Sequence, residues 1–106
     1  SFNYQLGKDP ELSPISYFLY QNYPNPFNPI TTLGYTLPND DIVNITIYDM
    51  KGSIVKTLIN SSQSIGYQSV QWNATNERNE PVSAGLYIYV LQAGEYNQTK
   101  KMVLLK

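Results

Sequence analysis

Hydrophobic and polar residues alternate along much of this chain, and turn-forming residues separate the alternating stretches. Residues 42–50 are the clearest example. There Val43, Ile45 and Ile47 would lie on one face of a strand, with the polar residues between them on the other. Residues 86–93 are apolar on both faces, which predicts a strand in the centre of a sheet.

The whole pattern predicts short strands and no helix, with turns about every 8–12 residues. We therefore expect an all-β fold, a seven-stranded antiparallel immunoglobulin-like β-sandwich. The polar residues 60–66 and 73–81 are expected to form loops. The predicted strands cover residues 17–21, 31–37, 42–50, 53–60, 67–73, 86–93 and 96–105.

Glycines mark two of the predicted turns. Asp49 opens a tight turn in which Gly52 takes the left-handed position, so that residues 53–60 return as the partner strand. Gly85 stands directly before the strand of residues 86–93. Both glycines are therefore assigned a structural role.

Two aromatic residues are expected in the core. Trp72 is the only tryptophan, and a domain of this size needs large side chains inside. Tyr87 stands at the start of the sixth predicted strand, where it is either the tyrosine of a tyrosine corner or an ordinary core tyrosine. Both interpretations give Tyr87 a structural role.

The alternation is broken by residues 20–32, which read Y-Q-N-Y-P-N-P-F-N-P-I-T-T. Pro24, Pro26 and Pro29 each fix φ and remove a backbone donor, which excludes both a helix and an interior strand. We predict a rigid, extended crossing over one end of the β-domain, and we call residues 22–29 the strap. By composition alone, a proline-rich linker between domains is the favoured alternative.

The side chains of the strap are expected to fix it in place. Tyr23 and Phe27 are large and apolar, so both are predicted to anchor it against the domain. Asn22, Asn25 and Asn28 are predicted to turn back onto the local backbone and supply the hydrogen bonds that the prolines deny to a sheet.

Composition describes one ordered domain. The 106 residues are 42% hydrophobic and 14% charged, which suits a single core and not a disordered tail. Aromatic residues make up 13%, and ten of them are tyrosines, which favours strands. Cysteine and histidine are absent. Their absence excludes disulfides, thiolate metal sites and most catalytic constellations.

Charge and hydropathy argue against nucleic acid as a partner and against a membrane-spanning segment. The net charge is −1 and the basic residues are spread along the chain, so there is no basic footprint for nucleic acid. No apolar run approaches the length of about 18 residues that a membrane span needs.

Residues 1–16 are polar and interrupted by Pro10 and Pro14. We expect a linker from an upstream domain, which could also add an edge strand. The start at Ser1, without a Met or a signal peptide, suggests a piece cut from a longer protein.

The acidic residues predict no catalytic or metal site, and we expect neither enzyme activity nor a cofactor. Asp40 and Asp41 follow Pro38 in a predicted turn, which favours a solvated pair. Glu77 and Glu80 lie in an oxygen-rich loop, yet the alternating acidic pattern of a Ca²⁺ loop is missing. No glycine-rich phosphate loop is present.

Tyrosines raise one further binding hypothesis. Tyr87, Tyr89 and Tyr96 cluster on the last two predicted strands and could form a platform that stacks on sugars. A sandwich without disulfides needs large core residues, so most of these rings are expected inside.

Several motifs, in order, resemble one family. They are Q-N-Y-P-N-P-F-N-P followed by T-T-L-G-Y-T-L-P, V-N-I-T-I-Y-D-M-K-G-S-I-V, V-Q-W-N-A-T-N, P-V-S-A-G-L-Y-I-Y and T-K-K-M-V-L-L-K. Over about residues 18–106 the chain resembles the C-terminal sorting domains of the bacterial type IX secretion system. The related immunoglobulin-like module of flagellar hook-capping proteins is similar. Asn79-Glu80 stand where that family usually has a glycine, and Ile65 where alanine is common.

The resemblance implies that residues 17–106 are an immunoglobulin-like sorting domain. Such a domain would direct a secreted bacterial protein through the periplasm to the cell surface or the medium. The implied partners are the outer-membrane secretion machinery, a sortase-like peptidase and the domain's own upstream passenger domain.

Two surfaces are expected to be recognised, the strap and the basic final strand. A rigid strap loses little ordering entropy on binding. An exposed edge strand can be captured by strand addition, although its lysines could equally protect it from pairing. The residues assigned to recognition are Asn22, Tyr23, Pro24, Asn25, Pro26, Phe27, Asn28, Pro29, Lys100, Lys101 and Lys106.

Two other functions remain open from the sequence. The first is an accessory binding or spacer module of a secreted hydrolase. An exposed aromatic strip with affinity for glycans would favour this function. The second is a hook-cap-like assembly domain, which would associate with itself.

Overall fold

The computed structural model describes residues 16–105, and every regular element in that part of the chain is a β-strand. The expected linker, residues 1–16, lies almost entirely outside the described residues, as does Lys106. The strands are β2 (Phe18–Leu19), β3 (Thr31–Leu37), β4 (Asp41–Tyr48), β5 (Ile54–Gln63), β6 (Gly66–Trp72), β7 (Gly85–Ala93) and β8 (Tyr96–Leu104).

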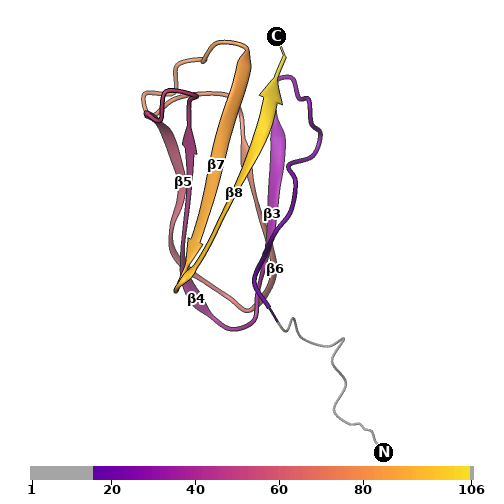
Figure 1. Ribbon diagram of the computed structural model, residues 1–106, viewed down its shortest axis with the longest axis vertical. Coiled ribbons are helices and arrows are strands. Elements are labelled where there is room, and N and C mark those ends of the chain that lie inside the picture. The colour runs from indigo at the N-terminus through magenta and orange to yellow at the C-terminus, as the bar shows by residue number, and fades with distance from the viewer. Residues whose placement is uncertain (1–15, 106) are drawn as a thin grey trace, which may run out of the picture.

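These seven strands form two antiparallel sheets that face each other (Figure 1). One sheet has the order β2-β3-β6 and the other the order β5-β4-β7-β8. The chain changes sheet after β3, after β5 and after β6, so strands from distant parts of the sequence pack together. The predicted seven-stranded immunoglobulin-like β-sandwich is confirmed.

The core lies between the sheets and is built from alternate residues of the strands. In β4, Val43, Ile45 and Ile47 are fully buried, as their alternation predicts. β7 adds Tyr89 and Leu91, which are also fully buried, and it has a neighbour on each side, as expected of a central strand. Burial of these large side chains is the main source of stability in this cysteine-free domain.

Trp72, at the end of β6, packs between two other rings. Its ring centroid is 5.7 Å from that of Phe27 in the strap and 5.3 Å from that of Tyr87 in β7. The indole N–H donates a hydrogen bond to the backbone carbonyl of Thr75 at 2.9 Å, so its one polar group is satisfied. This aromatic cluster joins the strap to both sheets.

Tyr87 forms a tyrosine corner. Its hydroxyl donates a hydrogen bond of 2.6 Å to the backbone carbonyl of Ser83, four residues earlier. Gly85 lies between the two with φ +146°, a conformation that L side chains rarely adopt. Of the two roles left open by the sequence, the hydrogen bond supports the corner.

The predicted turn after β4 is present. One carboxylate oxygen of Asp49 accepts hydrogen bonds from the backbone N–H groups of Lys51 (2.9 Å) and Ser53 (3.0 Å). Gly52 has φ +87° and donates its N–H to the carbonyl of Asp49. The side chain of Asp49 therefore replaces the backbone partners that a tight turn leaves unsatisfied.

β5 is longer than the sequence predicts. The expected end at residue 60 and the expected loop over residues 60–66 are wrong, because β5 continues to Gln63, which pairs with Asp41. The side chains of residues 60–62 are exposed, so this end of the strand carries no hydrophobic alternation. Pairing with the backbone of β4 holds it in the sheet.

Candidate recognition surface

The strap joins the two sheets along one side of the sandwich (Figure 1). Near its beginning, Tyr23 and Thr32 of β3 exchange backbone hydrogen bonds of 3.0 and 2.9 Å. Further on, the N–H of Phe27 donates to the carbonyl of Val103 (3.0 Å), and the N–H of Leu105 donates to the carbonyl of Phe27 (2.8 Å). The strap is thus fixed by backbone contacts to β3 and to β8.

Phe27 anchors the strap as predicted, but Tyr23 does not. The side chain of Phe27 is 1% exposed and packs on Trp72, whereas that of Tyr23 is 80% exposed. The expectation that both rings lie against the domain is therefore wrong for Tyr23. The backbone of Tyr23 pairs with β3, and this pairing leaves its ring in solvent.

Asn22 provides the second anchor and is 2% exposed. Its amide nitrogen donates to the carbonyl of Pro24 (3.1 Å) and to the hydroxyl of Thr31 (3.0 Å). The hydroxyl of Thr31 in turn donates to the same carbonyl at 2.8 Å. The predicted local role of Asn22 is present, and its burial means that it holds the strap and has little surface for a partner.

The hydroxyl of Tyr89 ties the strap to the core. It accepts the backbone N–H of Asn22 (2.8 Å) and donates to the carbonyl of Tyr20 (2.9 Å). Burial raises the pKa of Tyr89 to about 12, and the hydrogen bond from Asn22 opposes part of that rise. Tyr89 therefore remains neutral and bridges two backbone groups next to the strap.

Asn25 acts over a longer range than predicted. Its side-chain oxygen accepts the backbone N–H of Val103 at 2.9 Å, across 78 positions of the sequence. The expectation that this side chain bonds the local backbone is wrong, because the strap lies beside β8 and brings an unpaired strand N–H within its reach. Asn28 is exposed.

The C-terminal part of β8 is not a bare edge. The strap pairs with Val103 and Leu105, and the side chain of Gln21 donates to the carbonyl of Lys101 at 2.7 Å. The prediction that this part of the last strand is free for capture by strand addition is therefore wrong, since its outer hydrogen-bonding groups are already used.

The two described lysines of β8 do not form a single patch. Successive residues of a strand point to opposite faces, so Lys100 and Lys101 diverge. Lys101 is exposed and Lys100 is half-buried. The structure brings the strap and β8 side by side, but it separates these two charges.

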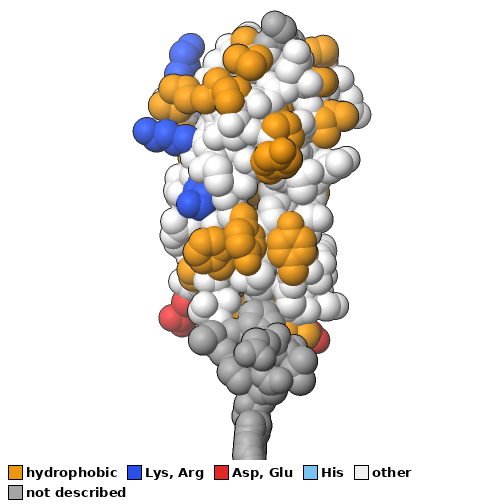
Figure 2. Space-filling model, turned by 90° about the vertical axis from the view of Figure 1, so that its right-hand side faces the viewer, with side chains coloured by type: hydrophobic (Ala, Val, Ile, Leu, Met, Phe, Trp, Pro, Cys, Tyr) orange, Lys and Arg blue, Asp and Glu red, His pale blue; other side chains and the backbone are white. Residues whose placement is uncertain are grey.

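The outward side of the strap is uncharged and mostly apolar. It consists of the ring of Tyr23 and the exposed residues Pro24, Asn25, Pro26, Asn28 and Pro29. On the face shown in Figure 2, hydrophobic side chains gather in several groups, while Lys and Arg side chains lie along one margin. A partner of the strap would thus contact a mostly apolar surface, with positive charges at its border.

The three tyrosines considered as a sugar platform do not form one. Tyr87 is 6% exposed and Tyr89 is fully buried, so neither can stack on a ligand. Tyr96 stacks on Tyr17 at 5.0 Å between ring centroids. These three tyrosines belong to the core and its border, as the need for large core residues suggested.

Most acidic residues of the described range lie in turns and loops, while Asp41 begins β4. Asp40 accepts the N–H of Ile65 (2.8 Å), and Asp41 accepts the hydroxyl of Tyr17 (2.7 Å), which raises the pKa of that tyrosine. Glu77 accepts the N–H of Thr57 at 2.9 Å. Residues 16–105 hold no cluster of three metal-ligating side chains.

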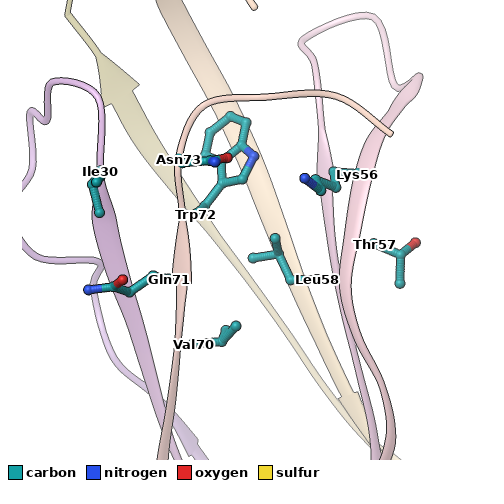
Figure 3. Close-up of a pocket in the computed structure, with 8 residues that line it drawn as sticks. All are labelled: Ile30, Lys56, Thr57, Leu58, Val70, Gln71, Trp72 and Asn73. Atoms are coloured by element: carbon teal, nitrogen blue, oxygen red, sulfur yellow. The ribbon is translucent and has the colours of Figure 1, made fainter. Parts of the chain in front are cut away.

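A groove of about 430 Å³ opens between β5 and β6, and Ile30, just after the strap, lies at its border (Figure 3). Beside it, the ammonium group of Lys56 donates to the hydroxyl of Thr75 (3.0 Å) and to the side chain of Asn79 (3.1 Å). The residues that line the groove include no nucleophile with an adjacent base. The lining residues are Ile30, Lys56, Thr57, Leu58, Val70, Gln71, Trp72 and Asn73.

No helix in the described part of the chain is long and apolar enough to span a membrane. No curated protein matches the sequence. A family model described as "FlgD Ig-like domain" matches residues 30–97, which is more than half of the chain. The match begins just after the strap and ends within β8.

Solved structures with the same fold include two proteins of Porphyromonas gingivalis. Dimeric latent PorU has a TM-score of 0.67 at 20% identity, and the match covers 84% of this chain and 9% of PorU. PorZ has a TM-score of 0.59 at 19% identity, over 94% of this chain and 12% of PorZ. PorZ is described as an essential bacterial surface component of the type IX secretion system.

A third structure with a similar fold comes from a DNA glycosylase. It is the alkylpurine DNA glycosylase AlkC of Pseudomonas fluorescens, bound to DNA, with a TM-score of 0.53 at 14% identity. The match covers 86% of this chain and 31% of AlkC. The chain thus spans about a tenth of PorU and PorZ and under a third of AlkC. At these identities the likeness shows the fold alone.

Proposed function

The chain belongs to the FlgD Ig-like domain family, and on that premise we propose that it is a non-catalytic sorting domain for type IX secretion. In this role it directs a secreted bacterial protein through the translocon to the cell surface or the medium. The motif series that resembles type IX sorting domains supports the proposal. So does the similarity in fold to PorZ, a component of that system.

The arrangement of the strap is the observation that carries the proposal. Asn22 and Phe27 are buried and hold the strap, while the ring of Tyr23 is 80% exposed. The prolines between them restrict the backbone, so the outward surface is ordered before any partner arrives. A partner that binds this surface loses little conformational entropy in ordering it, and preorganisation of this kind raises affinity.

The strap and β8 act together in this proposal. Hydrogen bonds from Gln21 to Lys101 and from Val103 to Asn25 hold the two segments side by side. Because these bonds occupy the outer edge of β8, the secretion machinery recognises side chains and not a free strand edge. Lys101 adds a positive charge at the border of the surface.

The domain itself performs no reaction in this role. It acts as a folded label on its passenger domain, and its partners are the outer-membrane secretion machinery and a sortase-like peptidase. The exposed strap residues provide contact area, and the buried ones fix the orientation of those residues.

An export assay tests the proposal. The 106-residue chain is fused to the C-terminus of an inert periplasm-targeted reporter and expressed in a bacterium with a working type IX system. We expect the reporter at the cell surface or in the medium. The Tyr23→Ser variant should lower export several-fold without a change in thermal stability, because this ring makes few contacts within the domain.

The matched control is Ile42→Ser, which replaces a side chain that is 67% exposed on β4, away from the strap. This variant should be exported like the parent fusion. Retention of the parent reporter in the periplasm would contradict the proposed function. Equal export of the parent and of Tyr23→Ser would leave the sorting role intact and remove the strap as its recognition surface.

A further inference from the structure

Three exposed aromatic rings lie together on the outer face of the three-stranded sheet. Phe18 of β2 is 49% exposed, Tyr20 just after β2 is 40% exposed, and Tyr67 of β6 is 62% exposed. The ring centroids of Phe18 and Tyr20 are 4.7 Å apart, and those of Tyr20 and Tyr67 are 5.8 Å apart. We call these three residues the aromatic face.

A glycine makes room for the largest of these rings. A Cβ atom added to Gly34 of β3 would lie 2.5 Å from the hydroxyl oxygen of Tyr67 and 3.0 Å from two of its ring carbons. Tyr67 pairs with Thr36, so its ring leans diagonally along β3 until it covers Gly34. A ring that lies across a sheet in this way turns its other side to solvent.

The sheet beneath the aromatic face carries no charge. Residues 17–37 and 57–76, which include the whole of β2, β3 and β6, contain no Asp, Glu, Lys or Arg. The four-stranded sheet differs, with Asp41 in β4, Lys56 in β5 and a pair of lysines in β8. Among residues 16–105, the aromatic face is therefore set in a neutral sheet, and the charged side chains lie on other segments.

Neutral hydrogen-bonding groups surround the rings. Alternation along the strands places Thr32 and Thr36 of β3 on the same outer face as Ser69 and Gln71 of β6. Ser69 and Gln71 are exposed, and the two threonines are half-buried. Hydroxyl and amide groups can both donate and accept hydrogen bonds, which suits a ligand rich in hydroxyls.

From these observations we propose that the aromatic face binds an uncharged polysaccharide. The C–H groups on one side of a pyranose ring pack against an aromatic ring, and the sugar hydroxyls bond to neutral side chains such as those of Ser69 and Gln71. No charged group of the sheet has to lose its water on binding. Exposed apolar patches of this kind mark binding sites in soluble proteins.

The tilt of the rings restricts the form of the ligand. The planes of Phe18 and Tyr20 are inclined by 62°, and those of Tyr20 and Tyr67 by 60°. Rings inclined in this way cannot all lie under one flat crystalline surface. They fit a single twisted chain, so the predicted ligand is a soluble or amorphous neutral polysaccharide.

Affinity electrophoresis of the whole chain tests this proposal. Native gels contain mixed-linkage β-glucan, xyloglucan or galactomannan as neutral probes and polygalacturonate as the anionic comparator. We expect at least one neutral polysaccharide to retard the domain and polygalacturonate to have no effect. Titration calorimetry with the retarding polysaccharide then gives the affinity.

Variants assign the binding to the aromatic face. Tyr67→Ala should weaken binding about tenfold, since it removes one stacking ring, and Tyr67→Phe should keep it. Gly34→Ala should also weaken binding, because its Cβ would displace the ring of Tyr67. The control is Tyr23→Ala, which removes an even more exposed ring on the strap and should leave affinity unchanged.

Three results would overturn the proposal. The first is no retardation by any of the neutral polysaccharides. The second is binding that Tyr67→Ala leaves unchanged in a protein that still folds by circular dichroism. The third is a concentration-dependent dimer in sedimentation that Tyr67→Ala abolishes, which would assign the face to a protein contact. Reporter export should be unchanged in Tyr67→Ala, so this proposal and the sorting role fail independently.

Discussion

At the scale of single residues, the hydroxyl of Tyr89 is a polar group at the border between the apolar core and the strap. It lies in a fully buried side chain, yet it bonds to the backbone of both Asn22 and Tyr20. A buried hydroxyl is tolerated only where such partners exist. These bonds therefore link the packing of β7 to the position of the strap.

Replacement of that hydroxyl gives the first prediction. Tyr89→Phe keeps the ring and leaves the N–H of Asn22 without a partner, so we expect a loss of about 1–3 kcal/mol in the free energy of unfolding at pH 7. Urea denaturation measures it. An unchanged midpoint would show that water replaces the hydroxyl.

The same residue predicts a dependence on pH. The pKa of Tyr89 is about 12 in the folded protein and about 10 in an unfolded chain. The contribution of the neutral Tyr89 side chain to the free energy of unfolding is complete below pH 10. It is lost as the pH rises through 12, because Tyr89 releases its proton in the unfolded state first. We expect unfolding midpoints to fall more steeply over this range in the parent protein than in Tyr89→Phe. Parallel curves would contradict the assigned pKa.

Trp72 is the second residue with a large predicted effect. Its indole is 1% exposed and contacts Phe27 and Tyr87. Trp72→Ala should cost about 3–5 kcal/mol, measured by urea denaturation. A loss below about 1 kcal/mol would mean that the surrounding rings close the cavity.

The sequence could not distinguish the two aromatic residues of the strap. Tyr23 and Phe27 lie in an irregular segment, where no period of two or 3.6 residues assigns a side to each position. The tertiary pairing of Phe27 with Leu104 decides which ring turns inward. Likewise, the bond from Val103 to Asn25 spans 78 positions and leaves no local signal.

At the scale of elements, the strap can be tested by a pair of variants. Phe27→Ala should cost about 3 kcal/mol and remove an anchor of the strap, whereas Tyr23→Ala should change stability by less than about 0.5 kcal/mol. Hydrogen exchange gives a local measurement. The amides of Val103 and Leu105, which bond to the strap, should lose protection in Phe27→Ala and keep it in Tyr23→Ala.

Equal protection of these two amides in both variants would contradict the inferred role of Phe27. It would mean that the backbone bonds of the strap to β8 hold without the buried ring.

Strands with a strong pattern were predictable from the sequence, and strands held only by their neighbours were not. β3 (Thr31–Leu37) was predicted with its observed bounds, because Pro38 ends a β-branched and aromatic run. The second half of β5 looked like a loop, since Ser61 and Ser62 carry no hydrophobic signal. Their place in the sheet follows from pairing with β4.

At the scale of the whole molecule, the last strand is part of the core. Met102 and Leu104 of β8 are 0% and 1% exposed. Removal of residues 102–106 takes away both side chains and the partner of the strap. We expect this truncated chain to lose its cooperative thermal transition and its near-ultraviolet circular dichroism.

The control for that truncation is Leu105→Ala. Its side chain is 50% exposed and its backbone N–H is retained, so stability should change by less than about 0.5 kcal/mol. A sigmoidal melt of the truncated chain would contradict the prediction and show that the other strands fold without β8.

The seven-strand sandwich could be predicted because its alternation and turns agree over most of the chain. The candidate recognition surface was predicted only in part. Different sequence features indicate the strap and β8, and the contact between them depends on the packing of the two sheets against each other. The spacing of residues in the sequence does not predict how the two sheets pack against each other.

The contact between the strap and β8 also has a consequence for synthesis. The ribosome makes residues 22–29 well before residues 103–105, so the strap can pair with β3 before its second partner, the end of β8, exists. Until β8 is made, the strap therefore lacks its contacts to Val103 and Leu105, and the sandwich stays open on that side. The domain can close fully only after the chain has been made at least as far as residue 105.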